Sequence, residues 1–552
     1  MNTSFLSNSL VKRLRGFVKS VAFVLLTVFL LSIIQSVLIP NDAWPVSSWS
    51  RPRLESFRRL PNDSVDCVLL GTSHMGCGVS PIYLYRDYGI TSYNLATSSQ
   101  SIYTTRYLVE EVFQTQNPSV VVLDASSLFF DNTDESEKSI TRTLACSCDL
   151  SAHLIAFLSM HNLLYSDLSN GNILDPEWYS LIDDNVMTFF SMCFPIVHYH
   201  GRWCEIEKND FINCFSHERY AEFAMGAYMG SAVVDNGSSV EEMNNKASTI
   251  DVDDIQKDTI SVIREIQAIC DEHQCKLLLV KIPSVADPSV YSSAWTLPRY
   301  ERMLEFVADT DIPYYDLLYD SDVAFDMHVD FLDGGGHLNA NGSLKATDAL
   351  GEYLLENGLA NPRVENVYED YLTMFRSEVE PVLSIQSETD FVKYLKLIDS
   401  LTDERYLYII STKGCAGSGI TDTEINQLND TFGIDYYLEN GESYVAIISN
   451  GRIIKEAKSS SGVSCDYSID GLRTTVSSNF TDSSIEIEDV EYSQNYYGIN
   501  IVVYDLKAEL VVDSLAFDPV PVPRSIYRSR QLTDQLFSDY LIRYVDNMTY
   551  FY

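Results

Sequence analysis

Residues 66–74 read DCVLLGTSH. Four apolar residues between an acid and a glycine are typical of a short strand that is buried on both faces. Ser73 and His74 then fall in the turn that ends this strand. A serine at such a turn can act as a catalytic nucleophile. A serine that only caps the following helix would give the same sequence pattern.

Patterns of alternating strands and helices extend outward from this stretch. We expect strands at 67–70, 92–96, 119–124, 276–281 and 314–318, and helices at 104–115, 255–272, 298–310 and 340–356. This alternation predicts a three-layer α/β fold, with a doubly wound parallel sheet covered by helices on both faces. Ligands of such sheets bind at the carboxyl ends of the strands, which is where Ser73 falls.

A second polar segment precedes the last of these helices. Residues 333–339 read DGGGHLN and supply a carboxylate, Asp333, and an imidazole, His337. A serine hydroxyl becomes a good nucleophile when an imidazole takes its proton and a carboxylate orients that imidazole. The sequence therefore predicts that the late loop folds back until His337 reaches Ser73.

An uncharged stretch near the amino terminus predicts a membrane span. Residues 21–40 carry no charge and have about the length that crosses a bilayer, and the basic residues of the 1–20 tail keep that end in the cytoplasm. A cleaved signal peptide is the alternative, but the bulky residues 35–39 do not resemble a cleavage site. We expect a single-pass protein of the cell membrane, with residues 41–63 as a spacer and the bulk of the chain outside the cytoplasm.

Composition excludes several classes of partner and cofactor. The net charge of −40 argues against nucleic acid and anionic lipid as partners, and a merely acidic soluble surface would explain it as well. The sequence has no dinucleotide-binding or Walker motif. Cys193, His198, His200 and Cys204 lie close together, but their spacing matches no zinc pattern. We expect no cofactor and no metal, and the pairing of the 11 cysteines stays open.

The 552 residues predict more than one domain. The α/β domain covers residues 64–358 and is interrupted by an insertion at about 131–251. A linker at 359–382 leads to a smaller β-rich α/β domain at 383–518. In that domain we expect a helix at 390–401, strands at 406–411, 444–448, 484–487 and 499–504, and loops in the Ser- and Gly-rich stretch 459–481. The tail at 519–552 contains an amphipathic helix at 532–545.

Three segments together resemble a known superfamily. They are GTSH at 71–74, NLATSSQ at 94–100 and DGGGHLN at 333–339. They are similar to the SGNH (GDSL-like) hydrolases and acyltransferases, and most to membrane-anchored members such as the D-alanyl transfer protein of teichoic acid synthesis and the alginate O-acetyltransferases. The likeness covers residues 64–358 without the insertion. It implies a flavodoxin-like α/β fold with Ser73 as nucleophile, His337 as base and Asp333 as the acid that orients it.

The chain departs from this superfamily in two places. The usual spacing of acid and base is Asp-x-x-His, whereas Asp333 lies four residues before His337, so Asp330 is an alternative acid. The Gly-x-Asn-Asp segment that supplies an oxyanion asparagine is absent after Asp124. The backbone N–H of Ser73 is then a candidate oxyanion donor, and Asn94 and Gln100 are candidates among the side chains.

The carboxyl-terminal domain carries a second resemblance. GINIVVYD at 498–505 and VDSLAFD at 512–518 are similar to the interleukin-like EMT inducer (ILEI) domain. This likeness implies a non-catalytic module that binds carbohydrate, and the alternative is a packing domain without a ligand.

These patterns lead to one main hypothesis and one alternative. The main hypothesis is a membrane-anchored, extracytoplasmic serine esterase or O-acyltransferase that acts on cell-surface glycans or acylated polymers through an acyl-enzyme. The resemblance implies a multi-span acyl-transport protein as a partner of the transferase type. The alternative is a surface glycan-binding or assembly protein that keeps the fold without catalysis.

Overall fold

The computed structural model describes the part of the chain that carries the predicted site. The described residues are 3–38, 50–129, 200–204, 206, 224–233, 239–242, 255, 257–285, 297–401, 405–435, 437, 441–449, 451–469, 471–520, 524–533, 535–537 and 540. They fall into two units that we describe separately. The first comprises Met1–Pro52 and Asn132–Glu218, and the second comprises Arg53–Asp131 and Arg219–Tyr552.

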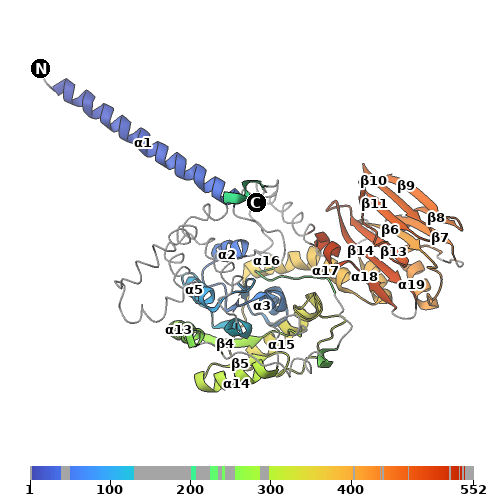
Figure 1. Ribbon diagram of the computed structural model, residues 1–552, viewed down its shortest axis with the longest axis horizontal. Helices are drawn as coiled ribbons and strands as arrows, with labels where there is room; N and C mark the ends of the chain where they lie inside the picture. The colour runs from blue at the N-terminus through green and yellow to red at the C-terminus, as the bar shows by residue number, and fades with distance from the viewer. Residues whose placement is uncertain are drawn as a thin grey trace. The chain divides into compact units, whose positions relative to one another are not determined.

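A five-stranded parallel sheet forms the centre of the α/β part (Figure 1). Its strand order is β2 (Ser92–Asn94), β1 (Cys67–Leu70), β3 (Val120–Asp124), β4 (Lys276–Lys281) and β5 (Tyr314–Asp316). The chain leaves β1 toward β2 on one side and later returns to β3 on the other. The carboxyl end of β1 is therefore the point of the sheet at which the connections diverge and leave room for a ligand. The parallel α/β sheet predicted from the sequence is confirmed.

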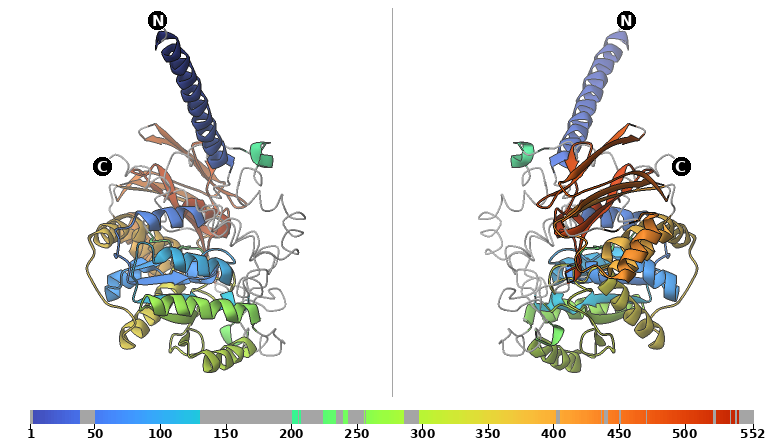
Figure 2. Two further views of the ribbon diagram at one scale, coloured as in Figure 1. Left: turned by 90° about the vertical axis from the view of Figure 1, so that its left-hand side faces the viewer. Right: turned by 90° about the vertical axis from the view of Figure 1, so that its right-hand side faces the viewer.

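Helices cover both faces of the sheet, and β1, β2 and β3 are buried along their whole length. Alternate residues of β1, β3 and β4 pack against α4 (Pro81–Tyr88) and α15 (Ala340–Glu356) in one apolar core, which contains Leu69, Val122, Val280, Leu84 and Leu350. The residues between them point to the opposite face. There α5 (Ile102–Val112) packs on α13 (Lys257–Glu272), and α14 (Leu297–Thr310) precedes β5 (Figure 2).

The carboxyl-terminal part consists of two antiparallel sheets. The larger has the order β15 (Ser525–Tyr527), β14 (Leu510–Asp518), β13 (Gly498–Asp505), β6 (Tyr406–Lys413), β7 (Ser443–Ser449) and β8 (Arg452–Ser459). The smaller has the order β12 (Val490–Glu491), β11 (Ser483–Ile487), β10 (Leu472–Ser478) and β9 (Val463–Ile469). Ile409 and Val445 of one sheet share a core with Val476 and Ile485 of the other. Helices α18 (Phe391–Ser400) and α19 (Asp422–Phe432) pack on each other beside the larger sheet.

The prediction of loops at 459–481 is wrong, because β9 and β10 form a hairpin there. Val463, Cys465 and Tyr467 alternate with polar residues and pack on the core, so only every second residue of β9 is apolar. Two of the serines that suggested loops, Ser464 and Ser468, occupy the exposed face of this half-buried strand.

Two segments predicted as irregular connections contain helices. In the expected linker 359–382 the chain forms α16 (Asn366–Met374), a π-helical turn η3 (Phe375–Val379) and the start of α17 (Glu380–Ser387). In the expected spacer 41–63 it forms α2 (Ser50–Arg59), whose Leu54 and Phe57 are buried. Tertiary burial of a few apolar side chains explains why helices form where prolines and polar residues predominate.

One helix has the properties of a membrane span. α1 (Thr3–Leu38) contains an apolar stretch, Arg15–Ile34, with a mean hydropathy of 2.5, and among the described residues no other helix is long and apolar enough to cross a bilayer. A signal sequence at this end of the chain would have the same properties. The stretch overlaps the predicted span 21–40 and begins six residues earlier.

Some predictions fall on residues that the structure does not describe. Most of the insertion at 131–251 lies outside the described residues, apart from short pieces that include η2 (His200–Cys204) and the segment 224–233. The predicted tail helix at 532–545 is described only in part, and residues 530–533 and 535–537 are helical.

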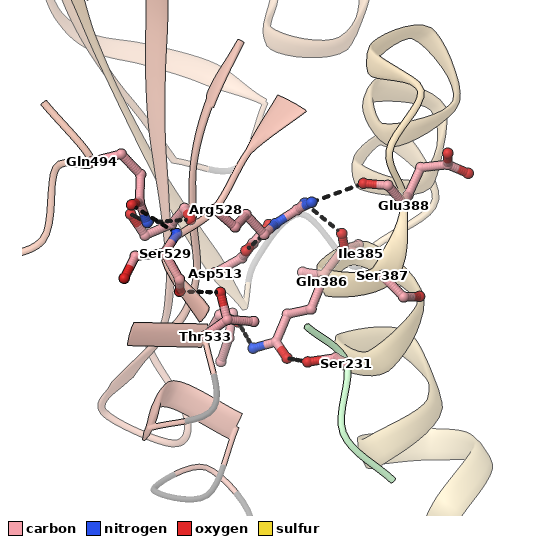
Figure 3. Close-up of polar contacts among 12 residues, drawn as sticks. Ser231, Ile385, Gln386, Ser387, Glu388, Gln494, Asp513, Arg528, Ser529 and Thr533 are labelled. Atoms are coloured by element: carbon pink, nitrogen blue, oxygen red, sulfur yellow. Dashed lines mark hydrogen bonds and ion pairs between the residues drawn. The ribbon is translucent and has the colours of Figure 1, made fainter. Parts of the chain in front are cut away.

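Buried polar contacts join the α/β part to the carboxyl-terminal part within the second unit (Figure 3). Arg528 pairs with Asp513 at 3.0 Å and also donates hydrogen bonds to the carbonyl oxygens of Ile385 and Glu388 at the end of α17. Gln386 donates to the Val512 carbonyl at 2.6 Å and accepts a hydrogen bond from Ser231. The two parts therefore share an interface that contains buried polar contacts.

Candidate active site

Ser73 stands at the carboxyl end of the central strand β1. The chain leaves β1 at Gly71, continues through Thr72 and enters the short helix α3 (Ser73–Gly78). Gly71 has a φ of +131°, and a Cβ there would lie 2.4 Å from the Cβ of Asp124. Only glycine fits this turn, because the end of β3 occupies the space that a side chain would need. The tight turn lifts the Ser73 hydroxyl above the edge of the sheet.

The loop before α15 carries the other two members of the predicted triad. A bridge between Phe331 and Leu338 and a hydrogen bond from Leu332 N to His337 O close this loop. Gly334 and Gly335 have positive φ values of 73° and 114°. A Cβ on Gly336 would lie 2.9 Å from a carboxylate oxygen of Asp333. The three glycines thus let the loop fold tightly enough for Asp333 to reach the residue four positions later.

The structure brings Ser73, His337 and Asp333 together in hydrogen-bonding order. Ser73 Oγ lies 2.8 Å from His337 Nε2, and His337 Nδ1 lies 2.7 Å from Asp333 Oδ2. A carboxylate can only accept, so Nδ1 carries the proton and Nε2 of the neutral ring accepts from the Ser73 hydroxyl. This is the tautomer that a general base needs in order to remove the proton of the serine.

The contacts of Asp333 favour its ionised form. Burial by itself raises the pKa of this carboxyl, but the side-chain hydrogen bond from His337, together with the backbone N–H of His337 at 2.7 Å and the charge of Arg530, brings the pKa below its usual value. The side chains of His337 and Asp333 are 20% and 19% exposed, so the pair lies at the surface end of the site.

The alternative acid, Asp330, lies elsewhere in the same loop. Its carboxylate forms an ion pair with Lys345 at 2.6 Å and accepts a hydrogen bond from Asp326 N at 2.7 Å. It therefore fixes the loop to α15. Asp333 is the carboxylate that contacts the His337 ring.

The two side-chain oxyanion candidates are engaged in holding backbone. Asn94 donates to the carbonyl oxygens of Met75 and Val79 at 2.9 and 3.1 Å. Gln100 donates to Leu95 O and Thr97 Oγ1, while its oxygen accepts from Gly71 N at 3.0 Å. Both amides are fully buried. They position α3 and the turn before Ser73, which leaves the Ser73 N–H as the remaining oxyanion candidate.

A segment within the predicted insertion was missed as part of the site. Residues 224–233 link the helix that begins at Ser73 to the helix that follows His337: Tyr228 N donates to Gly76 O of α3 at 2.8 Å, and Ala340 N of α15 donates to Gly230 O at 2.7 Å. Asn94 N donates to Met225 O at 2.8 Å, so the segment also lies along the edge strand β2. Its small and apolar composition was the only sequence signal, and no pairing partner could be inferred from it.

Buried charges lie beneath the triad at the carboxyl ends of β3, β4 and β5. Asp124, Lys281 and Asp316 are fully buried. Burial lowers the pKa of Lys281, which the charges of Asp124 and Asp316 oppose. Burial also raises the pKa of Asp316, although Tyr314, the backbone of Leu318 and Tyr319, and Lys281 counteract the rise. The positive charge of Lys281 thus lies between the carboxylates of Asp124 and Asp316 and interacts favourably with both. These side chains make the carboxyl end of the sheet polar beneath the triad.

The described residues contain no group of three or more His, Cys, Asp or Glu side chains arranged to hold a metal. Of the cysteines and histidines weighed as a metal cluster, Cys193 and His198 lie outside the described residues, and His200 and Cys204 belong to η2.

Comparisons with known proteins give a distant likeness to solved structures. No protein-family model matches the sequence, and no curated protein matches it. Among solved structures, a "putative acylhydrolase" from Bacteroides fragilis is similar at 11% identity and a TM-score of 0.24, over 55% of this chain and 94% of that one. A TM-score this low does not establish a shared family.

Proposed function

We propose that this protein is a serine esterase or O-acyltransferase of the SGNH type that acts through an acyl-enzyme. The observation that carries the proposal is the chain of contacts from Ser73 through His337 to Asp333, at 2.8 and 2.7 Å. Nucleophile, base and orienting acid come from opposite ends of one α/β part. Such an arrangement is the usual requirement for transferring an acyl group through a serine.

The proposed reaction has two halves. Ser73 Oγ attacks the acyl carbonyl of an ester while His337 Nε2 takes the hydroxyl proton, and Asp333 stabilises the resulting imidazolium. The Ser73 N–H supports the negative oxygen of the tetrahedral intermediate. The intermediate collapses to an acyl-serine when His337 returns its proton to the leaving alcohol. Water or a sugar hydroxyl, deprotonated by His337, then attacks the acyl-serine and releases Ser73.

We place this reaction at the outer side of a membrane, on acylated glycans or polymers of the cell surface. The apolar stretch of α1 and the basic residues ahead of it support an anchor with the remaining chain outside the cytoplasm. A multi-span acyl-transport protein would be the partner if the enzyme is a transferase. For the carboxyl-terminal part, with its two antiparallel sheets, we propose an ILEI-like, glycan-binding accessory role on the resemblance of residues 498–505 and 512–518.

A second function is a binding or assembly protein without catalysis. The observation that favours it is the engagement of Asn94 and Gln100, since neither amide is available to an oxyanion. With one backbone donor, stabilisation of the tetrahedral intermediate would be weaker than with two or three.

Hydrolysis of p-nitrophenyl acetate by the full-length protein in detergent decides between the two functions. We expect the wild type to release p-nitrophenol and Ser73→Ala to lose at least about 1,000-fold in kcat/KM. Ser400 is exposed at the end of α18, so Ser400→Ala is the matched control and should retain full activity. Equal rates in wild type and Ser73→Ala would favour the binding protein.

Reaction with a fluorophosphonate locates the nucleophile independently of the ester. We expect one adduct, on the peptide that contains Ser73, and none in Ser73→Ala. Addition of a sugar acceptor to the esterase assay then separates the two enzyme types, because only a transferase forms the acylated sugar faster than it forms free acid.

A further inference from the structure

His74 follows the nucleophile in sequence and stacks on the catalytic base. The rings of His74 and His337 have centroids 5.0 Å apart and planes inclined by 28°. Hydrolysis through Ser73, His337 and Asp333 requires no second imidazole. The role of His74 is therefore a separate question about the same site.

The contacts of Thr72 determine which nitrogen of His74 carries a proton. The Thr72 hydroxyl donates its one proton to the carboxylate of Asp124. Its oxygen therefore acts only as an acceptor, toward His74 N at 3.3 Å and toward His74 Nδ1 at 3.1 Å. Nδ1 must then be the donor, and a neutral His74 is held in the Nδ1–H tautomer.

The surroundings of His74 favour the neutral ring. Its side chain is 11% exposed. The pKa of His74 lies well below its ordinary value. Burial of the ring is the largest cause, and the charges of Lys281 and His337 add to it. Asp124 Oδ2 lies 4.0 Å from Nδ1 and would favour a cation, but the Thr72 hydroxyl is the nearer group and Lys281 offsets the carboxylate. The groups facing His74 are thus Thr72, Asp124 from β3, Lys281 from β4 and His337 from the loop before α15.

We propose that His74 is a positioning residue, a neutral imidazole that presents its aromatic face to His337 and stabilises the imidazolium formed when Ser73 is deprotonated. A cation over an aromatic face within about 6 Å is attracted to it. A second cation at the same place would instead repel the imidazolium. This inference rests on the proposed function, because it assigns His74 a part in the proton transfer to His337.

The pH dependence of kcat/KM in two variants tests the proposal. His74→Phe keeps a stacked ring, and we expect it to retain a third or more of kcat with an unchanged acidic limb. His74→Leu removes the ring, so the imidazolium loses its stabilisation. We expect kcat to fall about tenfold with KM unchanged, and the midpoint of the acidic limb to move down by about half a pH unit to one unit.

An upward shift of the acidic-limb midpoint in His74→Leu would overturn the proposal. Removal of a positively charged His74 would relieve repulsion and move the midpoint of the acidic limb up. Equal behaviour of the Phe and Leu variants, whether both active or both impaired, would also contradict a role for the ring face. Circular dichroism and thermal midpoints of both variants identify any loss that comes from misfolding.

Ring NMR of histidine decides the charge and tautomer of His74 without any assay. With ring-labelled histidine in the full-length protein, the His74 signals are identified by their absence in His74→Phe. We expect no titration between pH 5 and 8 and nitrogen shifts of the Nδ1–H form. A midpoint within that range would overturn the proposal. If the wild type hydrolyses no ester, the proposed function fails, and this measurement still decides the state of His74.

Discussion

The carboxylate of Asp333 both closes the loop before α15 and orients the ring of His337. Its two oxygens accept from the backbone and from the ring of the same histidine, at 2.7 Å each. The loop and the base are therefore oriented by one carboxylate. Asp330, three residues earlier, makes contacts of similar length to Lys345 and Asp326 N and stabilises the loop without touching the ring.

Asp333→Asn should cause a large loss of kcat in a protein that still folds. The asparagine amide can donate to Nδ1, which would place the ring proton on Nε2 and remove the acceptor for Ser73. We expect a loss of about 1,000- to 10,000-fold in kcat. Asp330→Asn is the control: it should leave kcat within about threefold and destabilise folding by about 1–3 kcal/mol. Equal losses of kcat in both variants would contradict the assignment of Asp333.

The lowered pKa of Asp333 also predicts a pH dependence of stability. Because the folded-state pKa is below the unfolded one, the ionised carboxylate stabilises the folded state above the unfolded pKa of about 3.9. That stabilisation is lost as pH falls through the folded value. Urea unfolding of wild type and Asp333→Asn should therefore differ most near neutral pH and converge below about pH 4. A difference that grows toward acid would refute the direction of the shift.

At the scale of elements, the segment 224–233 joins three elements that surround the candidate site. It contacts α3, the edge strand β2 and the start of α15 through backbone hydrogen bonds. Such bonds need close approach of main chains, and Gly226 provides it. A Cβ at Gly226 would lie 2.0 Å from the carbonyl oxygen of Asn94, and its φ is +83°.

Gly226→Ala should destabilise the protein more than a substitution at a glycine of similar φ in open space. Gly358 has a φ of +61° and nothing within 4 Å of its would-be Cβ, so Gly358→Ala isolates the conformational cost, about 1 kcal/mol. Gly226→Ala adds the clash, and we expect a total of about 2–4 kcal/mol with reduced esterase activity. Chemical denaturation and the ester assay measure both. Equal costs for the two variants would show that the segment adjusts without affecting β2.

At the scale of the whole second unit, the β-rich part is held to the α/β part by buried polar groups. Arg528 lies between Asp513 of β14 and two carbonyl oxygens of α17, and Gln386 of α17 links Val512 of β14 to Ser231 of the segment 224–233 (Figure 3). The carboxyl-terminal part is therefore connected to an element that contacts both the nucleophile helix and the base helix.

Arg528→Leu should weaken both stability and activity. Removing one partner leaves the Asp513 carboxylate buried and unpaired, which costs about 3–5 kcal/mol. The exposed pair Arg473–Asp489 is the control, and Arg473→Leu should cost less than about 1 kcal/mol with no loss of ester hydrolysis. Thermal unfolding and kcat/KM of both variants make the comparison. Unchanged activity in a folded but destabilised Arg528→Leu would show that the site forms independently of this interface.

The sequence by itself determined β1, β3 and β4, because each contains a short continuous apolar run. The shorter edge strands β2 and β5 contain polar residues and were placed by their position in the alternation of strands and helices. It also offered Ser73 and His337 as candidate site residues, since a polar residue at a strand end and a glycine-rich loop before a helix are local features. It misassigned 459–481, where strand alternation was hidden by serines on the outer face. It favoured Asp333 as the acid and kept Asp330 as the alternative, and beside the backbone N–H of Ser73 it offered the side chains of Asn94 and Gln100 as oxyanion donors.

Only the tertiary structure decided those last points. Which carboxylate reaches His337 depends on how three glycines fold one loop, and whether an amide is available depends on backbone carbonyls from other elements. The place of residues 224–233 likewise depends on hydrogen bonds to strands and helices more than 100 residues away in the chain. Local periodicity reports which face of an element is buried, whereas contacts between distant segments arise from packing and leave no periodic trace in the sequence.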